Sequence, residues 1–111
     1  MNNVASYIYD VTTQNFEEKV AKASFERPVL ADFWAGWCGP CKALAPLLER
    51  VVSSYHGKVA LARVNVDENR ELAVQFGVRS IPTVKIFANG EIADEFTGAI
   101  PEAQIRAMID E

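Results

Sequence analysis

Two cysteines separated by two residues are the part of this sequence best suited to chemistry. Cys38 and Cys41 are the only cysteines among 111 residues, and they lie in the run Trp37-Cys38-Gly39-Pro40-Cys41. Residues three apart in a helix have Cα atoms roughly 5 Å apart, inside the ~4.4 to 6.8 Å range that a disulfide spans. The pair therefore predicts a dithiol that opens and closes as a disulfide and exchanges with other disulfides.

The neighbouring elements distinguish the two sulfurs. An apolar strand is predicted over residues 29–34 and a helix over about 39–55, so Cys38 lies at the start of the helix. Free backbone N–H groups and the helix dipole favour a thiolate at this position. Cys41 lies one turn inside the helix and is shielded. We expect Cys38 to be the exposed nucleophile and Cys41 to be the resolving thiol.

Other roles for the cysteine pair have less support. A structural disulfide across so short a loop constrains the unfolded chain very little. A zinc site needs four ligands, and the only histidine, His56, lies at the far end of the predicted helix. A third alternative is that the dithiol marks a binding surface for client proteins, with redox turnover secondary. We expect no bound cofactor and no metal.

The elements around the cysteines predict an α/β fold. The expected strands are 7–11, 29–34, 59–66, 83–88 and 91–97, and the expected helices are 14–24, 39–55, about 68–76 and one that begins near residue 101. Asn89-Gly90, between the last two strands, is a strong hairpin signal. We expect one domain over residues 1–111, with a mixed, roughly five-stranded sheet flanked by helices on both faces.

Composition excludes several other classes of protein. The formal net charge is −4, and no run of Lys or Arg is present, which argues against a nucleic-acid partner. No segment approaches the ~18 apolar residues of a membrane span, and the first residues lack the pattern of a signal peptide. We expect a cytoplasmic monomer with no membrane partner. In a reducing compartment, paired cysteines are rarely structural.

Several motifs occur in the order typical of one family. They are the run from Asp32 to Lys42, the tripeptide Ile81-Pro82-Thr83, and the later Asn89-Gly90 and Gly98. On these residues the chain resembles the thioredoxins from about residue 7 to its end. The resemblance implies the thioredoxin fold, reduction of protein disulfides, and an NADPH-linked thioredoxin reductase as electron donor. The Gly-Pro pair between the cysteines is similar to the reducing members of the family rather than to oxidants or isomerases.

Asp32 interrupts the apolar strand that leads to the cysteines. Burial there should raise the pKa of its carboxyl group, and the resemblance implies that it accepts the proton of Cys41. Arg63 stands where the family commonly has a lysine. Because arginine keeps its proton at accessible pH, we expect Arg63 to hold Asp32 more ionised than a lysine would.

The resemblance also implies how a substrate docks. Ile81-Pro82 is expected to be a cis bond facing the dithiol, with the Ile81 backbone free to pair with a substrate strand. Glycine between the cysteines permits close approach of a partner chain, and proline stiffens the first turn. We expect a flat, mostly apolar docking surface made by Trp37, Gly39, Pro40, Ile81, Pro82, Thr97, Gly98 and Ala99.

The C-terminal part supports an alternative hypothesis. Residues 73–110 also resemble the N-terminal thioredoxin domain of a bacterial co-chaperone family whose C-terminal half is a helical-repeat region. Asp110-Glu111 stands at the negative end of the last predicted helix, where acidic residues are unfavourable. In this alternative, the chain is a domain of a chaperone-linked redox protein and acts mainly as a client-binding module.

Overall fold

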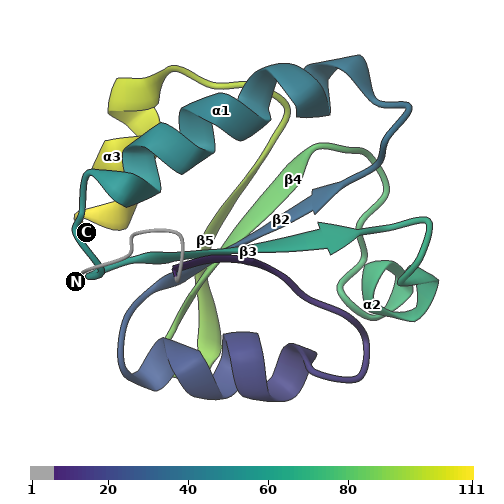
Figure 1. Cartoon of the computed structure of the whole chain (residues 1–111), viewed down its shortest axis with the longest axis horizontal. Helices are drawn as coiled ribbons and strands as arrows, with labels where there is room; N and C mark the ends of the chain where they lie inside the picture. The colour runs from purple at the N-terminus through teal and green to yellow at the C-terminus, as the bar shows by residue number, and fades with distance from the viewer. Residues whose placement is uncertain (1–6) are drawn as a thin grey trace.

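A five-stranded mixed sheet runs through the middle of the protein in the computed structural model, which describes residues 7–111 (Figure 1). Its strand order is β1-β3-β2-β4-β5. The strands are β1 (Ile8–Asp10), β2 (Val29–Trp34), β3 (Ala60–Asn65), β4 (Thr83–Ala88) and β5 (Glu91–Thr97). The central strand β2 pairs parallel with β3 and antiparallel with β4. The predicted mixed sheet is confirmed.

Helices cover both faces of this sheet (Figure 1). Helices α1 (Gly39–Ser53) and α3 (Glu102–Ile109) lie together over one face, and the short helices η2 (Glu17–Lys22) and η3 (Ala23–Phe25) lie under the other. Helix α2 (Arg70–Gln75) follows β3 and packs against the same core as η2. None of the helices within residues 7–111 has the length and apolar character needed to cross a membrane.

The central strand explains why the core has two halves. Side chains alternate between the two faces of a strand, so Leu30 packs with α1 and α3, whereas Val29 and Phe33 pack with η2 and α2. All three are fully buried. On α1, Leu44 and Leu48 supply the matching apolar stripe at i and i+4. The strand that leads to Cys38 is therefore held rigidly between two packed layers.

The first helix differs from its prediction. We expected one helix over residues 14–24, and the structure has a π-helix, η2, followed by the single 3-10 turn of η3. Phe16 and Val20 are buried as the apolar spacing indicated. Two turns of apolar spacing identify the inward face of a helix, but they do not distinguish its hydrogen-bonding pattern.

The hairpin between β4 and β5 is confirmed. Asn89 has φ 55° and Gly90 has φ 82°, the positive values that this tight turn requires at both central residues. Ser24, in η3, accepts hydrogen bonds from both turn N–H groups, through its carbonyl from Asn89 and through its hydroxyl from Gly90. The turn is thereby tied to the helix beneath the sheet.

Candidate functional site

The two cysteines form a disulfide at the junction of β2 and α1. Cys38 occupies the N-cap of α1 with an extended backbone, and its Sγ accepts a hydrogen bond of 3.1 Å from the backbone N–H of Cys41. The Cα atoms lie 5.3 Å apart, as the spacing predicted. The first sulfur is thus placed where helix N–H groups stabilise negative charge.

The expected exposure of Cys38 is wrong for this oxidised state. Cys38 is 4% exposed and Cys41 is 2% exposed, so both count as buried. They form a small cluster with Ala35, against which Trp34 and Ile81 pack. Capping places a sulfur at the helix end, but the loops that cover that end come from elsewhere in the chain. Exposure therefore does not distinguish the two sulfurs, whereas their positions in the helix do.

Asp32 lies buried in the central strand, with 1% of its surface exposed. In the parallel register of β2 and β3 its partner residue is Arg63, whose Nε lies 3.7 Å from Oδ2 of Asp32. That distance is too long for a hydrogen bond, and neither carboxylate oxygen has a hydrogen-bond partner within residues 7–111. Desolvation raises the pKa of Asp32 to about 6, and the charge of Arg63 opposes the rise.

Arg63 is held beside Asp32 by an aromatic ring. Its guanidinium carbon lies 4.4 Å from the centroid of the Trp34 ring, a cation–π distance. The side chain of Arg63 is 20% exposed. The guanidinium therefore reaches the buried carboxylate from a partly solvated position. The positive charge of Arg63 thus lies beside the carboxylate of Asp32, and the predicted difference from a lysine stays a prediction.

The loop before β4 lies against the disulfide. The Ile81–Pro82 bond is cis, as the resemblance implied, and Ile81 packs against the cysteine cluster. Gly98, with φ 83°, donates its N–H to the carbonyl of Pro82 over 2.8 Å, which brings the Thr97–Ala99 loop alongside. Within residues 7–111 the backbone of Ile81 has no hydrogen-bond partner. Pro82 itself is buried, so it contributes little to the expected docking surface.

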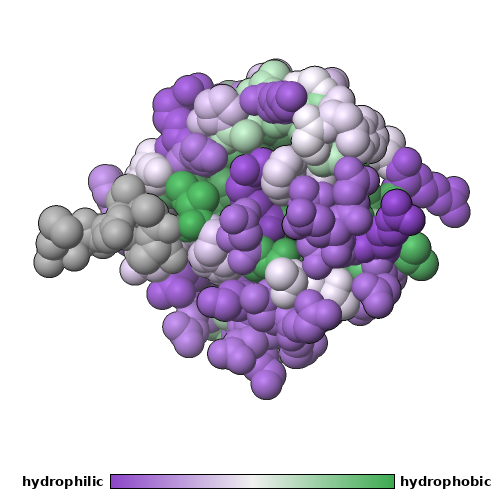
Figure 2. Space-filling model, turned by 45° about the vertical axis from the view of Figure 1, so that its right-hand side comes forward, coloured by the Kyte–Doolittle hydropathy of each residue, from purple (hydrophilic) through white to green (hydrophobic). Residues whose placement is uncertain are grey.

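A groove lies beside the disulfide and adjoins the surface on which we expect a substrate to dock. This α2 groove has a volume of about 650 Å³. Its apolar lining consists of Val66, Ala73, Val74, Val78 and Ile81. Its polar lining consists of Asp67, Arg70, Arg79 and Ser80, with the indole of Trp37 at one end. Figure 2, which turns the α2 side of the molecule forward, shows green apolar areas separated by purple hydrophilic side chains.

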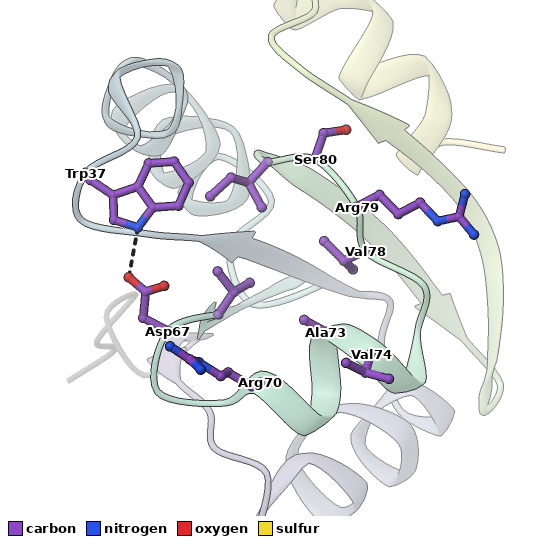
Figure 3. Close-up of a pocket in the computed structure, with 10 residues that line it drawn as sticks. Trp37, Asp67, Arg70, Ala73, Val74, Val78, Arg79 and Ser80 are labelled. Carbon is purple, nitrogen blue, oxygen red and sulfur yellow. Dashed lines mark hydrogen bonds between the residues drawn. The ribbon is translucent and has the colours of Figure 1, made fainter.

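Trp37 is fixed in place at this groove. The residue is 71% exposed, yet its Nε1 donates a 2.9 Å hydrogen bond to Oδ2 of Asp67 (Figure 3). Of the eight residues expected to form the docking surface, only Trp37 and Ile81 line the groove. Gly39, Pro40 and the Thr97–Ala99 loop lie outside its lining.

The contribution of α2 to this surface was missed from the sequence. Leu72 is 3% exposed and faces the core, while Val74, two residues later, is 80% exposed and lines the groove. Three consecutive apolar residues, 72–74, cannot all face inward from one short helix. That run was the available signal that an apolar side chain of α2 faces solvent.

Comparison with known proteins agrees with this geometry. Residues 7–111 match the family model described as Thioredoxin. The chain belongs to the thioredoxin family. A thioredoxin of Chlorobaculum thiosulfatiphilum is 42% identical to it over 107 residues, which cover 96% of this chain and 97% of that protein. A thioredoxin of Pseudomonas aeruginosa is 41% identical with the same coverage. Thioredoxin 2 of Chlorobaculum tepidum is 42% identical over 103 residues, 93% of each chain.

Family membership and site geometry together establish the activity. As a thioredoxin-family protein with a CxxC pair closed as a disulfide, the chain is a thiol–disulfide oxidoreductase. It acts as a protein-disulfide reductase, and Cys38 and Cys41 are its redox-active pair.

Proposed function

We propose that Cys38 attacks the substrate disulfide and that Cys41 resolves the intermediate. The observation that carries this assignment is the N-cap position of Cys38, whose sulfur accepts the N–H of Cys41. Helix N–H groups that point at a sulfur favour its thiolate, which is the attacking species. Cys41, one turn inside α1, receives less of this stabilisation.

The reaction then has two steps. In the first, the Cys38 thiolate bonds to one substrate sulfur, the substrate S–S bond breaks, and the other substrate sulfur leaves as a thiolate. In the second, the thiol of Cys41 gives up its proton and attacks Sγ of Cys38, which releases the second substrate thiolate. The dithiol has lost two electrons and the substrate has gained them. An external reductant must restore the dithiol, and we propose an NADPH-linked thioredoxin reductase in the cytoplasm.

Asp32 is the proposed acceptor of the Cys41 proton. With a pKa raised to about 6, its carboxyl group is mainly ionised at neutral pH and yet takes up a proton more readily than an ordinary aspartate. Arg63 keeps the ionised form available by its positive charge 3.7 Å away. Asp32 is thus the proton acceptor and Arg63 the residue that modulates it.

The free backbone of Ile81 supports a docking role for the loop before β4. We propose that a substrate segment pairs with this backbone in an extended conformation, as strands added to sheet edges do. The segment then lies between Trp37 and the Thr97–Ala99 loop. Pro82 supports the loop from beneath through its hydrogen bond with Gly98.

Insulin reduction with NADPH and a thioredoxin reductase tests the assignment. Because the chain has two cysteines, any mixed disulfide formed by Cys41→Ser must involve Cys38. We expect Cys38→Ser to lose turnover without forming mixed disulfides, and Cys41→Ser to accumulate them in a one-to-one complex. The reverse pattern would show that Cys41 attacks first. If the wild-type protein suppressed aggregation of an unfolded client but showed no turnover, the client-binding alternative would hold instead.

A further inference from the structure

The α2 groove differs in charge from the protein as a whole. Two arginines, Arg70 and Arg79, and one aspartate, Asp67, line it, which gives the lining a net charge of +1. The complete chain has a formal net charge of −4. The lining of the groove therefore carries a small positive charge on an acidic protein. Such a contrast directs acidic partners to one place on the molecule.

The two groove arginines are also the ones without an internal partner. The other four arginines of the chain each form an ion pair, as Arg27, Arg50, Arg63 and Arg106 do with nearby carboxylates. Among residues 7–111, neither Arg70 nor Arg79 does so, and both side chains are exposed. Their charges are therefore available to a molecule that enters the groove.

The position of Arg70 is not explained by the stability of its helix. Arg70 is the first residue of α2, where a positive charge meets the positive end of the helix dipole. Figure 3 shows its side chain reaching towards Asp67 and Trp37, while the side chain of Arg79 points the other way, outwards past Val78. The two arginines thus lie on opposite sides of the apolar lining.

The apolar lining provides the second half of a binding surface. Val74 is 80% exposed, and it lies in the groove with Ala73 and Val78. Burial of apolar surface contributes roughly 25 cal/mol per Å². A ligand with both an apolar and an acidic side chain would match this lining.

We infer that the α2 groove binds an extended, disulfide-bearing segment of the substrate protein that has an acidic side chain near its cysteine. An apolar side chain of this segment packs on Val74, and its carboxylate pairs with Arg70 or Arg79. The inference rests on the proposed function, since the segment must deliver its disulfide to Cys38. Arg70 and Arg79 are specificity residues in this arrangement and take no part in the chemistry.

Paired peptide substrates provide the test. Each pair contains the same intermolecular disulfide, with Glu or Gln placed in turn at each of the three positions on either side of the cysteine. The measured quantity is the ratio of kcat/KM for the Glu peptide to that for the Gln peptide. Exposed ion pairs contribute little, so we expect a ratio of about two to five per engaged arginine. The ratio should fall towards one in about 0.5 M salt.

Substitutions test whether the charges of Arg70 and Arg79 cause the preference for the Glu peptide. Arg70→Gln and Arg79→Gln should lower the ratio towards one, and Arg70→Lys should retain most of it because the charge remains. Lys58→Gln is the matched control, since Lys58 is exposed and follows the C-terminal end of α1, at the other end of that helix from Cys38. It should leave the ratio unchanged. Both groove substitutions are at exposed positions, so folded variants are expected, and circular dichroism checks this.

Each outcome has a separate meaning. Equal rates for Glu and Gln peptides with the wild-type protein would overturn this inference and leave the proposed function intact. Failure to reduce either peptide would overturn the proposed function itself. An acidic preference that survives loss of both arginines would also overturn the inference. Occupation of the groove by a second copy of the chain would also overturn the inference. It would be seen as a dimer in sedimentation and as a reduction rate per molecule that decreases as the protein concentration increases.

Discussion

Removing the buried charge of Asp32 should make the protein more stable. Asp32 is 1% exposed, its oxygens have no hydrogen-bond partner within residues 7–111, and its nearest cation is 3.7 Å away. An ionised carboxylate in that place is poorly compensated for the water that it loses. Asp32→Asn keeps the shape of the side chain and removes the charge.

The size of the expected stabilisation follows from the pKa of Asp32. Burial raises the pKa of Asp32 from an ordinary 3.8 to about 6. At about 1.4 kcal/mol per pKa unit, ionisation in the folded state costs about 3 kcal/mol more than in the unfolded chain. The value of about 6 already includes the attraction of Arg63. At pH 8, where Asp32 is ionised in both states, we expect Asp32→Asn to raise the free energy of unfolding by about 3 kcal/mol.

The pH dependence of stability independently tests whether Asp32→Asn stabilises the protein. Between about pH 4 and pH 6 the folded wild-type protein binds more protons at Asp32 than the unfolded chain does. Its stability relative to Asp32→Asn is therefore highest below about pH 4 and falls as the pH rises through about 6. The two proteins should be nearly equally stable at pH 3.5.

Urea denaturation of the oxidised proteins at pH 3.5, 5, 6 and 8 measures this difference. Glu18→Gln, an exposed carboxylate on η2, is the control and should change stability by less than about 0.5 kcal/mol at every pH. The reasoning would be refuted if Asp32→Asn were no more stable than the wild type at pH 8, or if its advantage did not vary with pH. The same variant should reduce insulin at least about tenfold more slowly, because the proton acceptor is gone.

Two further predictions concern the neighbours of the site. Arg63→Gln removes the positive charge that opposes the rise in the pKa of Asp32, so NMR titration should give this carboxyl group a pKa above 6. Arg63→Lys should shift the pKa of Asp32 less, in the same direction. An unchanged pKa in either variant would contradict the modulating role of Arg63. Leu48→Ala should lower the free energy of unfolding by about 2–5 kcal/mol in denaturant titrations, because Leu48 is fully buried between α1 and the sheet. Leu47→Ala, on the same helix but half-buried, should cost less, and equal losses would argue against this packing.

Local patterns predicted most of the fold. The bounds of β2, β4 and β5 agree with the predicted ranges 29–34, 83–88 and 91–97, because apolar runs and turn residues act over a few neighbours. The ends of α1 and α2 were displaced by one or two residues, as fraying and capping allow. The π-helical form of η2 was missed because apolar spacing over two turns fits more than one helix type.

For the candidate site, the positions of the residues were predicted correctly, but the exposure of Cys38 was not. The cysteine pair, Asp32, Arg63 and the cis bond at Pro82 were identified from residue types or from the family resemblance, and the structure places them as expected. The expectation that failed was the exposure of Cys38, whereas the docking surface stays a prediction. Exposure depends on which distant segments pack over a residue, and short-range patterns contain no information about that. The co-chaperone alternative stays a prediction.

The sequence by itself determined the chemistry: a dithiol with helix-turn spacing, at the end of an apolar strand that contains one carboxylate. Those properties depend on residues that are neighbours along the chain. Only the tertiary structure decided that Arg63 stands opposite Asp32, that Ile81 and Trp34 cover the sulfurs, and that α2 forms a groove beside Trp37. Apart from the contact of Trp34, which lies four residues before Cys38, these contacts join segments 30 or more residues apart in the sequence. Strand register and packing, rather than local pattern, therefore set them.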